Sequence, residues 1–147
     1  MNQISVMALF CEDIRDEKSG QVSLVGIMSD NANVPHPPKG TPTIGMIPKL
    51  AIYLRASFDV NAEIDEIKFV MELPDGEKVA VGSANAATIA EAKGTKAKGN
   101  PMGTIISTVK IQPLPLAKLG RITVRAYIGK QEYLAGFLNV ISEGAAA

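Results

Sequence analysis

The sequence contains one cysteine, one histidine and no tryptophan among its 147 residues. A single cysteine, Cys11, cannot form an intramolecular disulfide, and no set of cysteines and histidines has the spacing of a zinc site. The histidine, His36, lies in the stiff, extended segment Val-Pro-His-Pro-Pro, where no local pattern pairs it with Cys11 as the base of a cysteine hydrolase. Aromatic residues make up only 5% of the chain, which disfavours a sugar-binding groove and therefore a glycosidase.

An excess of charge and long apolar runs are missing as well. Fifteen basic side chains balance fifteen acidic ones, so no global field draws the molecule to nucleic acid or to anionic lipid. No segment approaches the run of about 20 apolar residues that crosses a bilayer, and the N-terminus lacks the basic start of a secretory signal. We therefore expect a cytoplasmic, bacterial protein that binds neither nucleic acid nor membrane.

Known catalytic motifs are also absent. The chain has no Gly-x-Ser-x-Gly elbow, no phosphate-binding loop of the nucleotide hydrolases and no dinucleotide fingerprint. The sequence therefore predicts a protein that is not an enzyme and that carries no cofactor.

The chain does contain a series of short segments in which apolar and polar residues alternate, separated by turn signals. This alternation predicts strands over 4–11, 21–28, 50–58, 64–73, 78–82, 104–112, 121–128 and 133–141, and a further short one over 30–34. One short helix is predicted over 84–92. We expect an all-β fold, namely an antiparallel two-sheet β-sandwich of immunoglobulin-like or C2-like type with eight or nine strands and at most one short helix. A closed barrel is the alternative. The sandwich is expected to span residues 1–142 as a single domain, and residues 143–147 to form a flexible tail.

Three segments lead to more specific expectations. Residues 21–28 are apolar on both faces, which is typical of a central strand covered on both sides. Residues 35–48 contain five of the nine prolines, so they are expected to form an extended loop outside any ladder. Residues 113–120 are expected to be a crossover that packs leucines without joining a sheet.

Acidic residues gather in the turn that follows the first predicted strand. Glu12, Asp13, Asp16 and Glu17 lie within six residues. Sandwich domains can bind Ca²⁺ through acidic loops at one end, because this hard cation prefers six to eight oxygen ligands. The alternative is a solvated hairpin turn in which Arg15 and Lys18 balance the acids, and the spacing is not that of an EF-hand.

Four outward positions on two alternating strands suggest an interaction surface. Tyr53, Arg55, Arg125 and Tyr127 would form one amphipathic patch if their strands share a sheet, and tyrosine and arginine are enriched at protein interfaces. The alternative is that they are ordinary solvent-facing strand residues.

The N-terminal segment carries a recognisable pattern. Phe10, Cys11, Glu12, Asp13, Ile14 and Arg15 are followed by Glu17 and Gly20, and then by the apolar segment 22–27, which includes Gly26. This arrangement resembles a family of small bacterial proteins of unknown function with the pattern Phe-Cys-(Asp/Glu)-Asp-Ile-Arg-x-Glu-x-x-Gly. The resemblance covers about 18 residues. It implies a β-sandwich, and it implies no reaction and no ligand.

These observations together predict a non-enzymatic binding or assembly module that acts through protein–protein interaction. Its partner is expected to be another protein or a second copy of itself, which would make it a homo-oligomer. The alternative function is a sandwich domain that binds Ca²⁺ or a small ligand through the acidic turn over 12–17.

Overall fold

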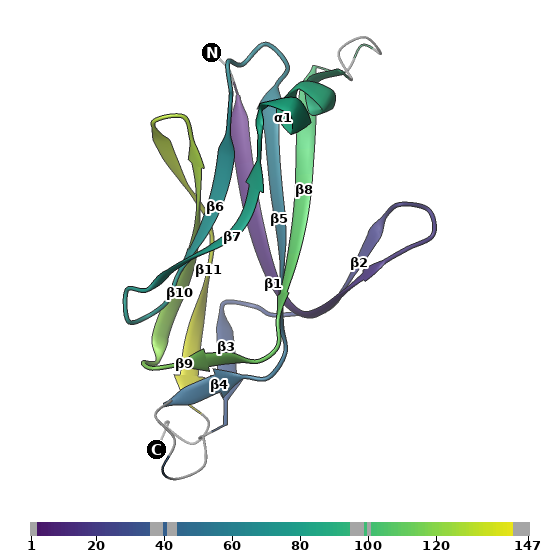
Figure 1. Ribbon diagram of the computed structural model, residues 1–147. Helices are drawn as coiled ribbons and strands as arrows, with labels where there is room; N and C mark the ends of the chain where they lie inside the picture. The colour runs from purple at the N-terminus through teal and green to yellow at the C-terminus, as the bar shows by residue number, and fades with distance from the viewer. Residues whose placement is uncertain (1–2, 36–39, 41–43, 95–98, 100, 143–147) are drawn as a thin grey trace.

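The chain forms an all-β sandwich with eleven strands and one short helix in its described part (Figure 1). The computed structural model describes residues 3–35, 40, 44–94, 99 and 101–142, so the expected tail over 143–147 lies outside the described residues. The elements are β1 (Ile4–Asp16), β2 (Val22–Ile27), β3 (Asn31–Val34), β4 (Gly45–Ile47), β5 (Leu50–Asp59), β6 (Ile67–Glu72), β7 (Lys78–Ala84), α1 (Ala86–Lys93), β8 (Met102–Ile111), β9 (Leu114–Leu116), β10 (Gly120–Ile128) and β11 (Gln131–Ser142). The predicted all-β sandwich is confirmed, with more strands than the eight or nine expected.

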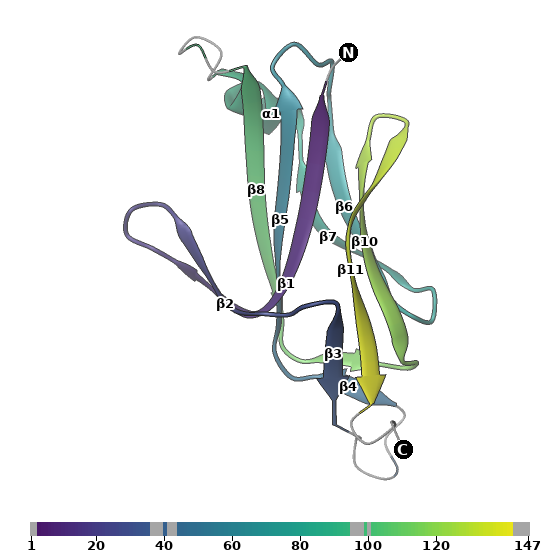
Figure 2. The same ribbon diagram turned by 180° about the vertical axis from the view of Figure 1, so that it is seen from behind.

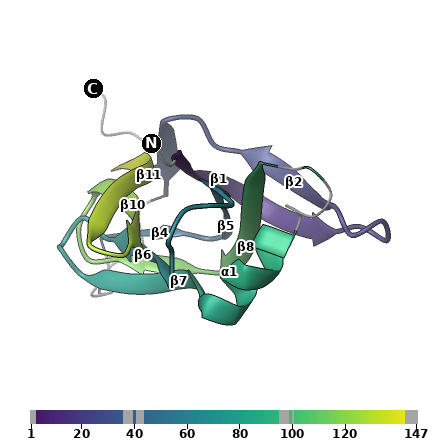
Figure 3. The same cartoon turned by 90° about the horizontal axis from the view of Figure 1, so that it is seen from above.

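The strands form two facing sheets and a small third one. The first sheet has the order β2-β1-β5-β8 and the second has the order β3-β11-β10-β6-β7, while β4 and β9 pair with each other. All pairings are antiparallel except that of β3 with β11, which is parallel. Seen from above, the two large sheets form two layers, and α1 lies beside β8 and β7 at one side of the sandwich (Figure 3).

Alternation along the strands builds the core between the two layers. Every second residue of β5 and of β10 points inward and is buried, because successive side chains of a strand point to opposite faces. The inward residues of these two strands are Ile52, Leu54, Ala56 and Phe58 on β5, and Ile122, Val124, Ala126 and Ile128 on β10.

The two sheets approach most closely where β1 faces β11. A Cβ atom on Gly136 of β11 would lie 2.6 Å from the backbone oxygen of Ala8 on β1. No other residue type fits this position without moving one of the strands, since interiors are packed at close to crystalline density. Gly136 therefore sets how closely β1 and the second sheet can pack.

Two segments that were expected to stay outside the sheets form strands. β4 lies in the proline-rich segment and β9 in the expected crossover, and they pair over three residues with Met46 opposite Pro115. A short pairing tolerates proline because both strands are edges, where a missing amide donor leaves no ladder bond unmade. The expectation that residues 35–48 and 113–120 make no ladder was wrong at these positions.

The first hairpin is longer than predicted and projects from the sandwich. β1 does not end at Cys11 but continues to Asp16, paired with β2 down to Val22. Figures 1 and 2 show β2 and the end of β1 extending sideways from the body of the molecule. The expectation of a central strand over 21–28 was wrong, because β2 is the outermost strand of the first sheet.

The ends of the described chain lie at opposite ends of the sandwich. β1 begins near the turn that follows β5, where the Asp59 amide donates to the Gln3 carbonyl, whereas β11 ends beside β3 at the other end (Figure 2).

Candidate functional site

The hairpin of residues 12–27 projects from the body of the first sheet (Figure 1). It is anchored to the outer face of the first sheet by a small second core, whose buried members are Cys11, Ile14, Ala51 and Tyr53. Val22 and Leu24 of β2 pack against this cluster and are half-buried. The hairpin is therefore held by apolar contacts that are separate from the main core.

Cys11 is part of this anchor. Its side chain is 0% exposed, and its thiol donates a weak hydrogen bond to the Ala51 carbonyl at 3.5 Å. Burial raises the pKa of the Cys11 thiol, and the nearby Asp13 carboxylate raises it further. Because the thiolate is the reactive form, burial and the raised pKa make this thiol poorly reactive in the folded protein. His36, the single histidine, lies outside the described residues.

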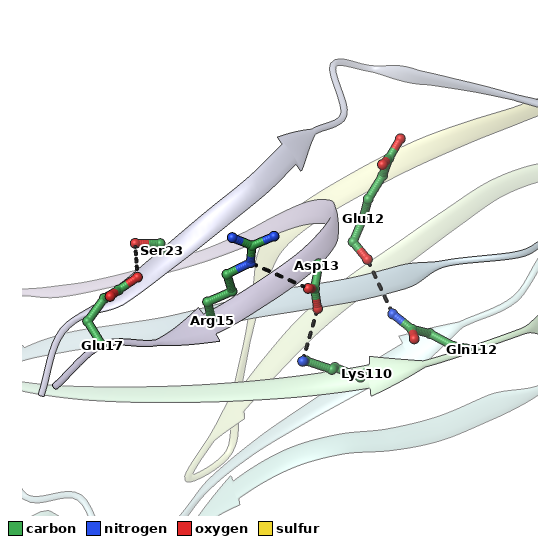
Figure 4. Close-up of polar contacts among 7 residues, drawn as sticks. All are labelled: Glu12, Asp13, Arg15, Glu17, Ser23, Lys110 and Gln112. Carbon is green, nitrogen blue, oxygen red and sulfur yellow. Dashed lines mark hydrogen bonds and ion pairs between the residues drawn. The ribbon is translucent and has the colours of Figure 1, made fainter.

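Polar contacts tie the base of the hairpin to β8 and the segment after it. The Lys110 ammonium group lies 2.9 Å from Asp13 Oδ1, and Arg15 Nε lies 4.0 Å from Asp13 Oδ2. Gln112 Nε2 donates to the Glu12 carbonyl at 3.3 Å (Figure 4). The hydrogen bond from Lys110, together with one from the Ile14 amide, lowers the pKa of the Asp13 carboxyl. These contacts fix the direction in which the hairpin leaves the sandwich.

A polar groove of about 360 Å³ lies at the base of the hairpin. Its charged lining residues are Glu12, Asp13, Arg15, Lys49 and Lys110, and Val25 and Gln112 complete the lining. A more apolar hollow of about 240 Å³ adjoins the groove, and Glu12 and Lys49 line both the groove and the hollow.

The outer strand of the hairpin is apolar and open. Val25 is 37% exposed and Ile27 is 57% exposed, and no residue from Ser19 to Ser29 carries a charge. Natural sheets usually protect an edge strand with charged residues, proline or a covering element, since its free amides and carbonyls can pair with another chain. β2 has no charged residue and no proline. One of its edges pairs with β1, and no strand of the sheet pairs with the other edge.

The other edge strands are better protected. β7 and β8 contact each other and also α1, and both carry lysine, at Lys78 and Lys110. β3 has only four residues and contacts β4, while β4 and β9 have three residues each and β9 contains Pro115. Among the strands that the structure describes, β2 therefore offers the most accessible edge.

Gly26 gives the hairpin its local shape. Its φ is +66°, a conformation that other residues rarely adopt, and an added Cβ would come within 3.0 Å of the Glu12 side chain. The positions 12 and 26 are not paired, although their neighbours are. The register is the same on both sides of this position, so the ladder is interrupted here without a bulge.

The four predicted metal ligands do not form a cluster. Asp13 is engaged by Lys110 and Arg15, Glu17 accepts a hydrogen bond from the Ser23 hydroxyl at 2.9 Å, and Asp16 lies on the exposed end of β1. Because residues 12–16 form an extended strand, side chains alternate in direction and spread along it. No group of three or more His, Cys, Asp or Glu side chains within the described residues could hold a metal ion.

The predicted interaction patch is split between the two sheets. Tyr53 and Arg55 lie on β5 of the first sheet, while Arg125 and Tyr127 lie on β10 of the second. Tyr53 is 8% exposed because the hairpin covers it. Arg125 binds Glu72 at 2.8 Å and Glu132 at 3.0 Å. The condition that the two strands share a sheet is not met, so the four residues form no single surface.

Sequence reasoning missed the open edge of β2, although one signal was present. A strand whose residues are apolar on both faces and uncharged over its whole length can be either fully covered or an unprotected edge. Gly26 is that signal, because a glycine inside a strand gives no side chain to pack and is less suited to a strand covered on both faces.

Comparison with known protein families and with curated proteins finds no match to this chain. The resemblance of residues 10–27 to the family of small bacterial proteins stays a prediction. No helix within the described ranges is long and apolar enough to cross a membrane.

Proposed function

We propose that this protein is a non-catalytic protein-interaction module that binds an extended segment of protein along the free edge of β2. Such a segment would add a strand to the first sheet, with main-chain hydrogen bonds providing affinity and side-chain contacts providing specificity. The observation that carries this proposal is the projecting hairpin, whose outer strand is uncharged, apolar and open.

The structure of the hairpin supports a binding role in two ways. The small core around Ile14 and the ion pair of Asp13 with Lys110 hold the hairpin in one position, so little conformational entropy is lost on binding. Exposed Val25 and Ile27 supply apolar area that a partner would cover.

A site-specific photo-crosslinker tests this proposal. We would place p-benzoylphenylalanine at position 27 on the β2 edge and, as a matched control, at position 134 on β11, where Leu134 is similarly exposed at 61%. In the cells that express the protein, we expect the crosslinker at position 27 to form adducts with another protein chain and the crosslinker at position 134 to form none. The protein identified in the adduct should then be purified and should bind the wild-type chain in calorimetry. Its affinity for the Val25→Lys variant should be at least tenfold lower than its affinity for the wild type. Equal adducts at both positions, or none at 27, would refute the proposal.

A further inference from the structure

We infer that the partner on the β2 edge is a second copy of this chain, with the two β2 strands paired antiparallel about a twofold axis. This inference rests on the proposed function and names its partner. The pairing would join the two four-stranded sheets into one continuous sheet through the two hairpins.

The absence of charge on β2 is the first argument. In a twofold pair the same strand faces itself, so any charged side chain near the axis lies close to an identical charge, which is destabilising. Residues 19–29 contain no charged side chain, although 20% of the whole chain is charged. The strand is therefore free of the like-charge repulsion that would oppose self-pairing.

The charges at the tip and at the base of the hairpin are the second argument. Antiparallel pairing over residues 22–27 places the tip of each hairpin beyond Ile27 and beside Met28 of the other copy. Met28 and Lys49 line the same hollow at the base of the hairpin. The tip has one more acidic than basic side chain, since Asp16 and Glu17 exceed Lys18.

The base of the hairpin offers a cation to this tip. The hollow beside Met28 has Lys49 and Glu12 as its charged lining residues. Lys49 forms no ion pair with any of the residues that the structure describes. The ammonium group of Lys49 is thus available to Asp16 or Glu17 at the tip of the other copy, and the twofold axis repeats this contact on both sides.

The exposed apolar side chains complete the match. A twofold axis normal to the sheet places one residue of β2 opposite itself, so with the axis at Val25 the exposed Val25 side chains of the two copies meet and Ile27 lies opposite Ser23 on the same face. One strand pair is smaller than a standard interface of about 800 Å² per partner. We therefore expect a dimer with a Kd of the order of micromolar, about 1–100 μM.

Sedimentation velocity over a range of concentrations tests this pairing with the full chain. We expect the wild type to dimerise and Ile27→Lys to weaken dimerisation at least tenfold, because two new charges would flank the pairing. Leu134→Lys introduces the same charge at an equally exposed position of the second sheet and should leave the dimer unchanged. Circular dichroism checks that each variant folds.

Cysteine crosslinking gives a second measurement that does not depend on weakening the dimer. The native Cys11 is fully buried, so Val25→Cys should be crosslinked to itself by a short bis-maleimide, while Leu134→Cys should not. A dimer that resists Ile27→Lys, or that crosslinks only through position 134, would overturn the pairing. A monomeric wild type that still forms adducts with another protein at position 27 would overturn this inference and leave the proposed function standing. A monomer with no adduct at position 27 would refute both.

Discussion

Truncation of Ile14 to alanine should release the projecting hairpin while leaving the sandwich intact. Ile14 is 4% exposed and belongs to the small outer core, not to the main core between the sheets. Three apolar side chains of the hairpin form its anchor on the first sheet. Ile14 is buried, and Val22 and Leu24 are half-buried against the same small core.

The size of the effect follows from this short list of contacts. Full burial of one aliphatic side chain stabilises by about 1.5–3 kcal/mol, and the two half-buried ones contribute about half as much each, so the apolar anchor is worth about 3–6 kcal/mol. Replacing a buried isoleucine with alanine costs about 2–5 kcal/mol. The variant should therefore lose about half or more of the anchoring free energy.

Hydrogen exchange measured by mass spectrometry would locate this loss. A two-stranded hairpin without support is only marginally stable in water, so the amides of β2 should open once the anchor fails. A loss of 2 kcal/mol corresponds to exchange about 30-fold faster in β2, whereas β10 and β11 should keep their protection because their side chains lie in the main core.

Ile106→Ala on β8 is the matched control, because Ile106 is exposed and outside both cores. It should change exchange nowhere by more than a few-fold. Unchanged protection of β2 in Ile14→Ala would refute the anchoring role. Equal loss of protection in β2 and β10 would show that Ile14 supports the whole fold, and would also refute it.

Three further predictions concern other contacts. Gly136→Ala should destabilise the fold by about 1–3 kcal/mol in urea unfolding, because the new Cβ meets the Ala8 carbonyl, whereas Gly94→Ala, which meets nothing within 4 Å, should be neutral or slightly stabilising. The Cys11 thiol should react with a thiol reagent only as fast as the protein opens, so that mild urea accelerates labelling strongly; immediate labelling of the native protein would contradict its burial. In Lys110→Met the pKa of Asp13, followed by carboxyl NMR, should rise toward its ordinary value. Because the folded pKa is the lower one, the ion pair stabilises the wild type above the ordinary pKa of aspartate, and this stability is lost as the pH falls through the folded value. An unchanged Asp13 titration would exclude Lys110 as the cause.

Much of the sandwich could be predicted because most of its strands have one solvent-exposed face and one face that packs in the core. Apolar and polar residues alternate along β5 and β10, and the structure buries the inward residues so predicted; on β5 the hairpin also covers the outward Ala51 and Tyr53, which alternation does not predict. The pairing of β4 with β9 could not be predicted, since each has only three residues and Gly45 and Leu116 are far apart in the sequence. Nothing local encodes a ladder of that kind.

The candidate site was harder to predict than the fold. Apolar residues on both faces of β2 specify that the strand avoids water, but they do not specify what covers it, and the structure leaves one side open. Alternation likewise places Tyr53 and Arg125 on outward faces, but it does not say that these faces belong to different sheets. Both errors concern the arrangement of strands across the molecule, which the period of a single strand does not contain.

The opposite placement of the two chain ends has a practical consequence for tethering. Because Ile4 begins β1 at one end of the sandwich and Ser142 ends β11 at the other, copies fused head to tail would line up as a rod instead of folding back on each other. The hairpins would then point outward from the sides of such a rod, so a fluorescent label or an affinity handle at either end leaves them uncovered.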